Sequence, residues 1–327
     1  MEYFDLHCDT LCELSPYRLY RRRPGTLRAN GGQLDLTRAA RYTRYAQVFA
    51  LFCGARPIET AEEAHTRLHT LLQTAREAFA SCADVLLPCA SADDLRAAER
   101  QGKAAAFLSI EGAELLQSEP DIQAAIDAGV RIVTLTWNHR SRYGCGAVTD
   151  NGAGLTGEGI RLAQRLAAHG VFLDVSHLSE RGFWELLDST SAPVLATHSN
   201  SRAVCPHVRN LTDAQFCAIV RRGGRVGVNL YVPFLTQQRR ADCTDIVRHI
   251  EHFCALGGAE QLCIGADWDG CDCLPDGIPD VTGIECLAEA LARHGYSDTQ
   301  IRNLMYDNAK RFVETNFIID TGIPKTK

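Results

Sequence analysis

Short runs of hydrophobic residues alternate with longer amphipathic stretches along the whole chain. Eight of the short runs have the length and composition of buried strands, at residues 3–7, 46–51, 104–110, 131–136, 171–175, 193–197, 225–229 and 261–266. Most of these runs are apolar throughout, which is typical of parallel strands that are covered on both faces. The longer stretches show helical spacing, at residues 60–81, 158–169, 179–189, 212–222, 243–256, 283–294 and 297–314.

This alternation predicts an α/β fold, a (β/α)₈ barrel of the TIM type. No linker rich in proline, glycine or serine interrupts the pattern, so we expect residues 1–327 to form a single domain. The number of strands alone also allows a doubly wound sheet. The barrel gives the more specific prediction, because residues that carry out chemistry should then follow the strands at their carboxyl ends.

The composition is that of an ordinary globular protein. The 327 residues include 46% hydrophobic and 23% charged residues, which excludes a disordered or fibrous chain. The formal net charge of −6 argues against a nucleic-acid-binding protein. The first residues lack the pattern of a signal peptide, no apolar run is long enough to span a membrane, and several of the 14 cysteines lie in apolar runs. We therefore expect a cytoplasmic protein with reduced cysteines and no membrane partner.

Ionisable side chains follow four of the predicted strands. His7 and Asp9 close the first strand, and their spacing places both on one face of an extended segment. Glu111 follows the third strand, where a buried carboxylate is costly unless it is paired or bound to a metal. His177 and His198 end the fifth and sixth strands. Each residue alone also fits a structural role, as a core histidine or a helix cap, but in a barrel all five lie at the same rim.

Three histidines, an aspartate and a glutamate are a donor set that suits Zn²⁺ or a similar divalent ion. Five ligands exceed the three that a catalytic zinc ion usually takes from the protein, so the set favours two ions that share one carboxylate. Such a pair can activate water and polarise a carbonyl group. The sequence therefore predicts a metal-dependent hydrolase.

Two further residues complete the candidate chemistry. Asp267 follows the eighth strand, and a carboxylate there that is not a metal ligand can take a proton from water and pass it to a leaving amine. Its alternative role is a hydrogen bond to the loop. Arg209 lies in the loop after the sixth strand, where it can bind a substrate carboxylate through two parallel hydrogen bonds, although a loop arginine is usually solvated.

The same residues stand in stretches that resemble the renal, or membrane, dipeptidase family of zinc dipeptidases (peptidase family M19), in its bacterial cytoplasmic branch. The matching stretches are DLHCDT at residues 5–10, IEG at 110–112, LDVSH at 173–177, THSNS at 197–201, PHVRNLTD at 206–213, GGRVGVN at 223–229 and IGADWDG at 264–270. They cover essentially the whole chain in order, and their combination is specific although each stretch alone is not.

The resemblance implies a barrel of the metal-dependent hydrolase type with two zinc ions per chain. The implied ligands are His7 and Asp9 for one ion, His177 and His198 for the other, and Glu111 as the bridging ligand and a catalytic residue. By the same resemblance, Arg209 binds the C-terminal carboxylate of a dipeptide and Asp267 transfers the proton. The family cleaves dipeptides and often accepts a D-residue at the C-terminal position. Many members are dimers, so a homodimer is expected.

One substrate contact departs from the family pattern. Mammalian members carry a substrate-contacting histidine after the fourth strand, in the context Leu-Thr-Leu-Thr-His, where this chain has Trp137. Either Asn138 or His139 then supplies the missing hydrogen-bond donor to the reacting substrate, or the pocket differs from that of the mammalian members.

Two other functions fit parts of the pattern. Another barrel amidohydrolase, acting on a cyclic amide, lactone or amino-purine, would share the metal site, and a non-catalytic zinc-binding protein would share its ligands. The five ligand positions and the proton-transfer position are all filled, which favours an enzyme. His65 and His69 lie four residues apart on a predicted helix, but they lack the adjacent glutamate of a zinc-protease helix and fit an exposed helix face.

Overall fold

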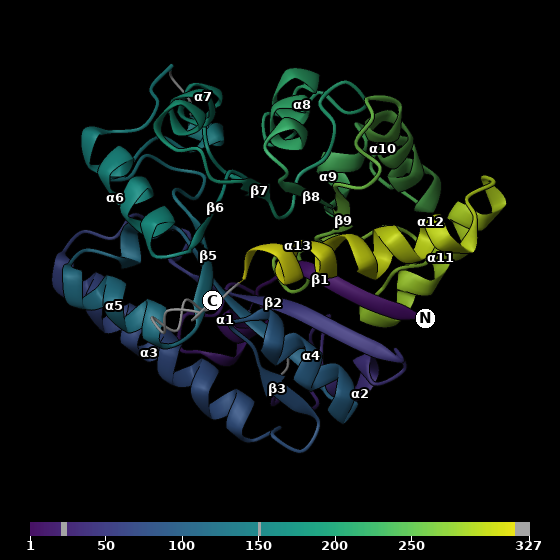
Figure 1. Cartoon of the computed structure of the whole chain (residues 1–327), viewed down its shortest axis with the longest axis horizontal. Helices are drawn as coiled ribbons and strands as arrows, with labels where there is room; N and C mark the ends of the chain where they lie inside the picture. The colour runs from purple at the N-terminus through teal and green to yellow at the C-terminus, as the bar shows by residue number, and fades with distance from the viewer. Residues whose placement is uncertain (21–24, 150–151, 318–327) are drawn as a thin grey trace, which may run out of the picture.

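Eight parallel strands close into a ring in the computed structural model, which describes residues 1–20, 25–149 and 152–317. They are β1(Glu2–Cys8), β2(Arg44–Phe52), β4(Ala104–Glu111), β5(Val130–Thr134), β6(Phe172–Asp174), β7(Val194–Ala196), β8(Arg225–Val228) and β9(Leu262–Ile264). Each strand pairs with the next around the ring, and β9 pairs with β1 through Ile264 and Asp5, which closes the barrel (Figure 1). All eight strands coincide with the predicted runs, so the (β/α)₈ barrel is confirmed and the doubly wound sheet is excluded.

A ninth strand, β3(Leu86–Pro88), was not predicted. It pairs with the first residues of β4, beginning with Leu86 opposite Ala104. β5 pairs with β4 only from Leu108 onward, so β3 covers the part of this edge that β5 does not reach. A three-residue strand that ends in proline has too little pattern to be recognised in the sequence.

A coat of helices surrounds the barrel. Six helices match the predicted ranges to within one residue at each end: α3(Ala61–Ala80), α6(Gly157–Ala168), α7(Glu180–Ser189), α8(Asp213–Arg221), α10(Cys243–Ala255) and α11(Ile284–Arg293). Hydroxyl caps explain several of the starts, because Thr60, Thr156 and Ser179 each accept a hydrogen bond from a backbone amide of the first turn. In the described part of the chain, no helix is both long and apolar enough to cross a membrane.

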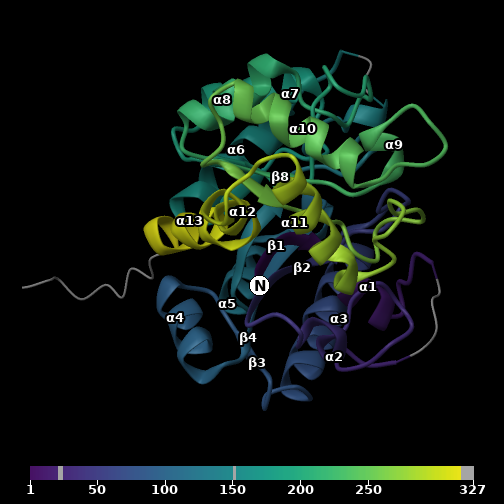
Figure 2. The same cartoon turned by 90° about the vertical axis from the view of Figure 1, so that its right-hand side faces the viewer.

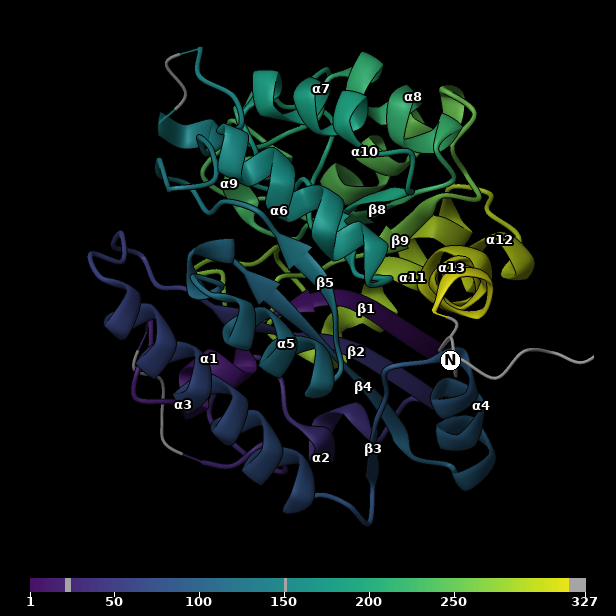
Figure 3. The same ribbon diagram turned by 60° about the vertical axis from the view of Figure 1, so that its left-hand side comes forward.

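Several shorter elements were not predicted. These are α1(Thr10–Leu14), α2(Leu36–Ala39), α4(Ala92–Gln101), α5(Glu119–Asp127), α9(Val232–Leu235) and the 3₁₀ turns η1(Ala113–Leu115), η2(Ala147–Thr149) and η3(Val281–Gly283). α3, α4 and α5 lie along one side of the barrel and α6, α7, α8 and α10 along another, while α11 to α13 cover a third (Figures 1, 2 and 3).

The stretch predicted as one helix at 297–314 contains a wider turn. α12(Asp298–Arg302) continues into a π-helical turn, η4(Asn303–Asp307), and then into α13(Asn308–Asn316). The turn includes the fully buried Tyr306, whose hydroxyl donates a hydrogen bond to Glu99 of α4. A buried side chain with a specific partner therefore occupies the point where the helix departs from regular geometry.

Large side chains fill the barrel from its floor toward its mouth. Phe4 of β1 stacks on Phe107 of β4 with ring centroids 5.7 Å apart, and Phe317 packs edge-on against Phe107 at 5.8 Å. The C-terminal helix reaches this floor because Asn308 donates to the carbonyl of Leu262, the first residue of β9. Along β4, alternate residues share the inner face, so Glu111 lies at the mouth above Phe107.

Truncation of Phe107 tests whether this interior is a packed core. Phe107→Ala removes a ring that is 1% exposed, and the resulting cavity should lower the free energy of unfolding by about 3–5 kcal/mol in urea denaturation followed by circular dichroism. Phe107→Leu keeps most of the buried volume and should cost clearly less. Val85→Ala, at a side chain that is 38% exposed, should stay within about 0.5 kcal/mol. A loss below about 1 kcal/mol for Phe107→Ala would contradict a packed floor.

Candidate metal centre and active site

β1 brings His7 and Asp9 to the inner rim of the barrel. The pairing of β1 with β2 shifts register between Asp5 and Cys8. Cys8 packs into the outer core, whereas His7 Nε2 lies 3.5 Å from Asp9 Oδ2. Asp5 fixes this irregular segment, because its carboxylate accepts hydrogen bonds from the amides of His7 at 3.0 Å and Ala266 at 3.1 Å. Burial raises the pKa of the Asp5 carboxyl to about 6.

Glu111, the last residue of β4, lies between two sets of imidazoles. Its Oε1 atom is 2.9 Å from His177 Nε2 and 3.7 Å from His198 Nε2. Its Oε2 atom is 3.7 Å from His7 Nε2. Burial, and then the negative charge of Asp9, raises the pKa of Glu111 well above its ordinary value. The two oxygens of one buried carboxylate thus face different histidines.

His177 and His198 direct the same ring nitrogen toward each other. They follow β6 and β7, and their Nε2 atoms are 2.8 Å apart. His177 Nδ1 lies 2.8 Å from Asn138 Oδ1, and because an amide oxygen only accepts, this nitrogen carries the proton. His198 Nδ1 lies 2.9 Å from the hydroxyl of Thr197, which itself donates to Asp174 at 3.0 Å. Thr197 therefore accepts from His198, and Nδ1 of this ring is also protonated.

These hydrogen bonds leave the Nε2 atoms of both imidazoles as lone-pair acceptors. Together with Glu111 Oε1 they place three acceptor atoms within 3.7 Å of one another in a buried space. Burial, and then the positive charges of Arg209 for His177 and His7 for His198, lowers the pKa of both rings well below the ordinary value. Converging acceptors repel each other unless a cation binds them, and neutral imidazole with carboxylate suits Zn²⁺ and similar ions.

The other half of the site, which we call the acidic half, consists of His7, Asp9 and Asp267. His7 Nε2 is 3.5 Å from Asp9 Oδ2 and 3.9 Å from Asp267 Oδ1. Burial lowers the pKa of His7, but the carboxylates of Glu111, Asp9 and Asp267 outweigh burial and raise it to about 10. His7 Nε2 and Asp9 Oδ1 are buried and have no hydrogen-bond partner among the described residues. These atoms also fit a divalent cation.

Asp267 follows β9 in a backbone conformation that few residues adopt. Its φ is +66°, in the left-handed region, and Asp269 has the same value. The amide of Asp9 donates to the carbonyl of Trp268 at 2.8 Å, which ties this turn to the end of β1. Asn229 Nδ2 donates to Asp267 Oδ2 at 3.0 Å, so Oδ1 is the oxygen that faces the acidic half. Burial raises the pKa of Asp267 above its ordinary value.

Arg209 is a buried cation whose hydrogen-bond donors are unused. The residue is 3% exposed, and within the described ranges its Nε, Nη1 and Nη2 atoms all lack a hydrogen-bond partner. Its guanidinium carbon lies 5.4 Å from the centre of the Phe234 ring. Burial lowers the pKa of Arg209 to about 10, although Asp267 and Glu111 oppose this shift. A buried guanidinium with unused donors can bind an anion, so the structure leaves room for the carboxylate contact predicted for Arg209.

The two residues predicted to replace the substrate-contacting histidine contact other side chains. Asn138 binds His177, and His139 Nε2 lies 2.8 Å from Glu114 Oε2. The ring of Trp137 lies near two imidazoles, with its centroid 6.0 Å from that of His177 and 5.8 Å from that of His139. His139 Nδ1 is buried and has no hydrogen-bond partner in the described part of the chain. Donation to substrate by Asn138 or His139 stays a prediction.

Sequence reasoning missed the residues that lie beneath the predicted metal ligands. Asp174 accepts hydrogen bonds from Thr134 Oγ1 at 2.6 Å, Ser176 Oγ at 2.6 Å and the Thr197 amide at 2.8 Å. It thereby joins three neighbouring strands below the histidines, as Asp5 joins β1 to β9. The available signal was a single carboxylate inside an otherwise apolar run, which requires buried partners.

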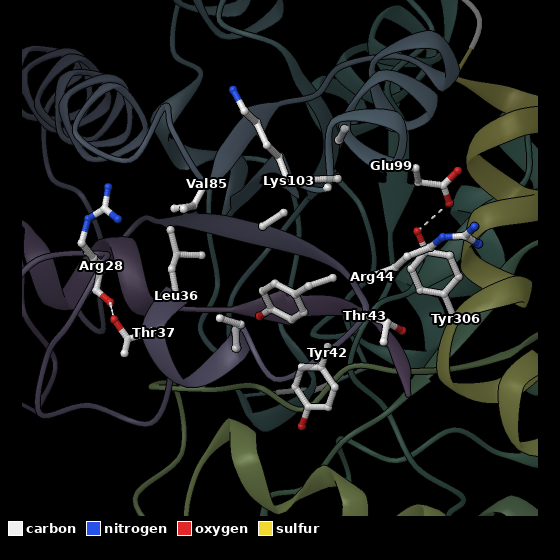
Figure 4. Close-up of a pocket in the computed structure, with 17 residues that line it drawn as sticks. Arg28, Leu36, Thr37, Tyr42, Thr43, Arg44, Val85, Glu99, Lys103 and Tyr306 are labelled. Carbon is white, nitrogen blue, oxygen red and sulfur yellow. Dashed lines mark hydrogen bonds between the residues drawn. The ribbon is translucent and has the colours of Figure 1, made fainter.

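A separate hollow lies at the opposite end of the barrel (Figure 4). Its volume is about 370 Å³, and its walls include Arg44, Lys103 and Tyr306, at the starts of β2 and β4 and in η4. Its cations have partners, because Arg44 pairs with Glu2 at 3.0 Å and Lys103 donates to the carbonyl of Ala83 at 2.7 Å. None of the predicted site residues is among its walls, so the chemistry points to the mouth of the barrel.

Solved structures of metallopeptidases share this fold. A metallopeptidase from Rhodobacter sphaeroides, liganded with a phosphinate mimic of the dipeptide L-Ala-D-Ala, is 27% identical with a TM-score of 0.85, over 97% of this chain and 99% of that chain. The dipeptidase AC, a metallopeptidase of family M19, is 28% identical with a TM-score of 0.85 over the same fractions. The match therefore extends over nearly the whole of each chain.

Comparisons of sequence agree with those of structure. A protein from Klebsiella pneumoniae, described as an uncharacterized protein in the pqqA 5′ region, is 37% identical over 250 residues, which are 73% of this chain and 92% of that protein. The family model of the membrane dipeptidases matches residues 1–319, a range that contains every predicted site residue. The chain therefore belongs to the membrane dipeptidase family, peptidase family M19, and is a metal-dependent dipeptidase.

Proposed function

We propose that the protein hydrolyses dipeptides with two zinc ions bound at the barrel mouth. His7 and Asp9 would hold one ion, His177 and His198 the other, and Glu111 would bridge them. One observation carries the proposal: Glu111 Oε1 lies 2.9 Å from His177 Nε2, while Oε2 lies 3.7 Å from His7 Nε2 on the other side of the carboxylate. A carboxylate whose two oxygens face separate imidazole nitrogens supports a role as a ligand shared by two cations.

When bound, the ions would supply a nucleophile from water at neutral pH and polarise the carbonyl group of the peptide bond. The surrounding side chains prepare this site. Asn138 and Thr197 hold the protonated nitrogens of His177 and His198, so that the unprotonated Nε2 atoms would be free to bind the proposed ion. Such hydrogen bonds fix both the tautomer and the orientation of a ligand ring.

Asp267 would move the proton of the reaction. Because Asn229 holds its Oδ2 atom, Oδ1 is the atom that accepts a proton from the attacking water. The same atom then gives this proton to the amine nitrogen as the carbon–nitrogen bond breaks, so that one water is consumed and two amino acids are released. Burial raises the pKa of Asp267, which suits a carboxylate that must hold a proton and release it again.

Arg209 would limit the length of the substrate. Its guanidinium can bind the C-terminal carboxylate of a dipeptide through two parallel hydrogen bonds. A longer peptide would present a neutral amide at this point and leave a buried charge unpaired, which is costly. The proposed substrates are therefore dipeptides with a free carboxylate.

Two further features extend the proposal. The relative from Rhodobacter sphaeroides that is liganded with a mimic of L-Ala-D-Ala supports a substrate range that includes a D-residue at the C-terminal position. The buried, reduced thiols of Cys8, Cys53 and Cys263 support action in a reducing compartment, the cytoplasm. We take residues 1–327 to act as one domain.

A panel of dipeptides of both stereochemistries tests the function. We expect zinc-loaded protein to release amino acids from L,L and L,D dipeptides, to lose this activity in a chelator and to regain it with added Zn²⁺. Metal analysis of the same samples should give at least two zinc ions per active chain. Turnover of lactones, cyclic amides or amino-purines without any release of amino acids from dipeptides would contradict the proposal.

Substitution of Arg209 tests recognition of the carboxylate. Arg209→Ala should lower kcat/KM for a dipeptide by roughly 100-fold or more, since it removes two charged hydrogen bonds. It should change kcat/KM for the C-terminally amidated dipeptide much less, because that substrate lacks the carboxylate. Arg209→Lys keeps the charge but loses the planar guanidinium, so its kcat/KM for the dipeptide should lie between those of wild type and Arg209→Ala. Arg293→Ala, at a side chain that is 68% exposed, is the control. Equal losses on both substrates would refute this role.

Removal of a hydroxyl tests the hydrogen bond behind His198. Thr197→Val keeps the shape of the buried side chain but removes the oxygen that accepts from His198 Nδ1, so zinc affinity should fall about 10- to 100-fold. Competition with a metal indicator measures this affinity. Thr197→Ser retains the hydroxyl and should stay close to wild type. Unchanged affinity in Thr197→Val would show that the contact does not support the metal site.

A further inference from the structure

The helical coat carries a second group of potential metal ligands, outside the barrel mouth. His65 and His69 lie one turn apart on α3, with ring centroids 4.2 Å apart. Their side chains are 56% and 46% exposed, so both rings are accessible to a solvated ion. In the sequence this pair lacks the neighbouring glutamate of a zinc-protease helix.

The fold supplies the missing carboxylate from another helix. α5 lies beside α3 (Figures 1 and 3), and its Asp121 faces both rings. Asp121 Oδ1 is 2.7 Å from His65 Nδ1 and 3.7 Å from His69 Nε2, and the side chain of Asp121 is only 2% exposed. Its other oxygen accepts a hydrogen bond from the hydroxyl of Ser118 at 2.5 Å, which holds Oδ1 toward α3.

The three side chains can bind one cation with little rearrangement. One ligand atom from each lies within 4.8 Å of the other two. Ligand atoms of a tetrahedral zinc site are about 3.3 Å apart, given bonds of about 2.0–2.1 Å, so small rotations of the exposed rings suffice. Two imidazoles and one carboxylate suit zinc and its neighbours among the late first-row metals, and a fourth position stays open to water.

We propose that His65, His69 and Asp121 form a second, exchangeable site for a divalent cation such as Zn²⁺, and that the bound ion joins α3 to α5. This site is independent of the proposed catalytic pair. It has a single carboxylate and two solvent-exposed rings, whereas the barrel mouth has buried ligands and three carboxylates. It should therefore bind zinc more weakly and exchange it faster than the barrel mouth does.

His69→Gln separates this site from a simple contact between His65 and Asp121. The variant removes one ligand and leaves the 2.7 Å contact between the other two in place. In equilibrium dialysis against buffered Zn²⁺, wild type should bind one more equivalent per chain than His69→Gln. The melting temperature of wild type should also rise with zinc after the barrel mouth is filled, and that of the variant should not.

Further variants complete the test. His169→Gln, at an exposed histidine directly after α6, should bind as much zinc as wild type. His69→Cys replaces imidazole with a thiolate, another zinc ligand, and should recover the extra equivalent. Dipeptidase activity of zinc-loaded His69→Gln should match wild type, which separates failure of this site from failure of the catalytic proposal. Equal zinc content and equal melting temperatures in wild type and His69→Gln would overturn the proposal.

Discussion

The structure of the barrel mouth depends on one constraint: several hydrogen-bond acceptors with lone pairs are held together in a small buried space. Two neutral imidazole nitrogens and a carboxylate oxygen meet within 3.7 Å on one side of Glu111, and a third imidazole meets carboxylates on the other. Folding must hold these groups together against their mutual repulsion and against the loss of hydration. The ends of the barrel strands hold these groups in position. Asp5 and Asp174 fix the strand ends because they accept hydrogen bonds from backbone amides and hydroxyl groups directly below the predicted ligands.

The two halves of the site differ in charge, although one residue joins them. On one side, burial and neighbouring positive charges keep His177 and His198 neutral. The carboxylate that contacts these two rings is that of Glu111. On the other side, three carboxylates surround His7 and raise its pKa to about 10. If the proposed pair of ions binds, the one in the acidic half would be neutralised more completely. The one beside His177 and His198 would keep more of its positive charge and would be the better partner for a polarised carbonyl oxygen.

Much of this arrangement could be predicted from the sequence, for a physical reason. A strand buried on both faces must be apolar throughout, so each histidine or carboxylate at the end of such a run is conspicuous. The polar residues at the strand ends could therefore be recognised in the amino-acid sequence, and a parallel barrel brings them together. Other features could not be predicted, because they depend on side-chain geometry between strands. These are the hydrogen bonds of Asp174 and the different histidines that the two oxygens of Glu111 face. Pairing of His65 with Asp121, 56 residues away, depends likewise on how two helices pack.

The floor of the barrel has a consequence for the synthesis of the protein. Phe317 packs against Phe107, and Asn308 binds the start of β9, so the last described helix seals an interior built from residues made much earlier. A growing chain on the ribosome has every strand available before this seal emerges. Until α13 and Phe317 dock, the apolar side chains at the floor of this barrel stay exposed to solvent, where they can associate with other chains.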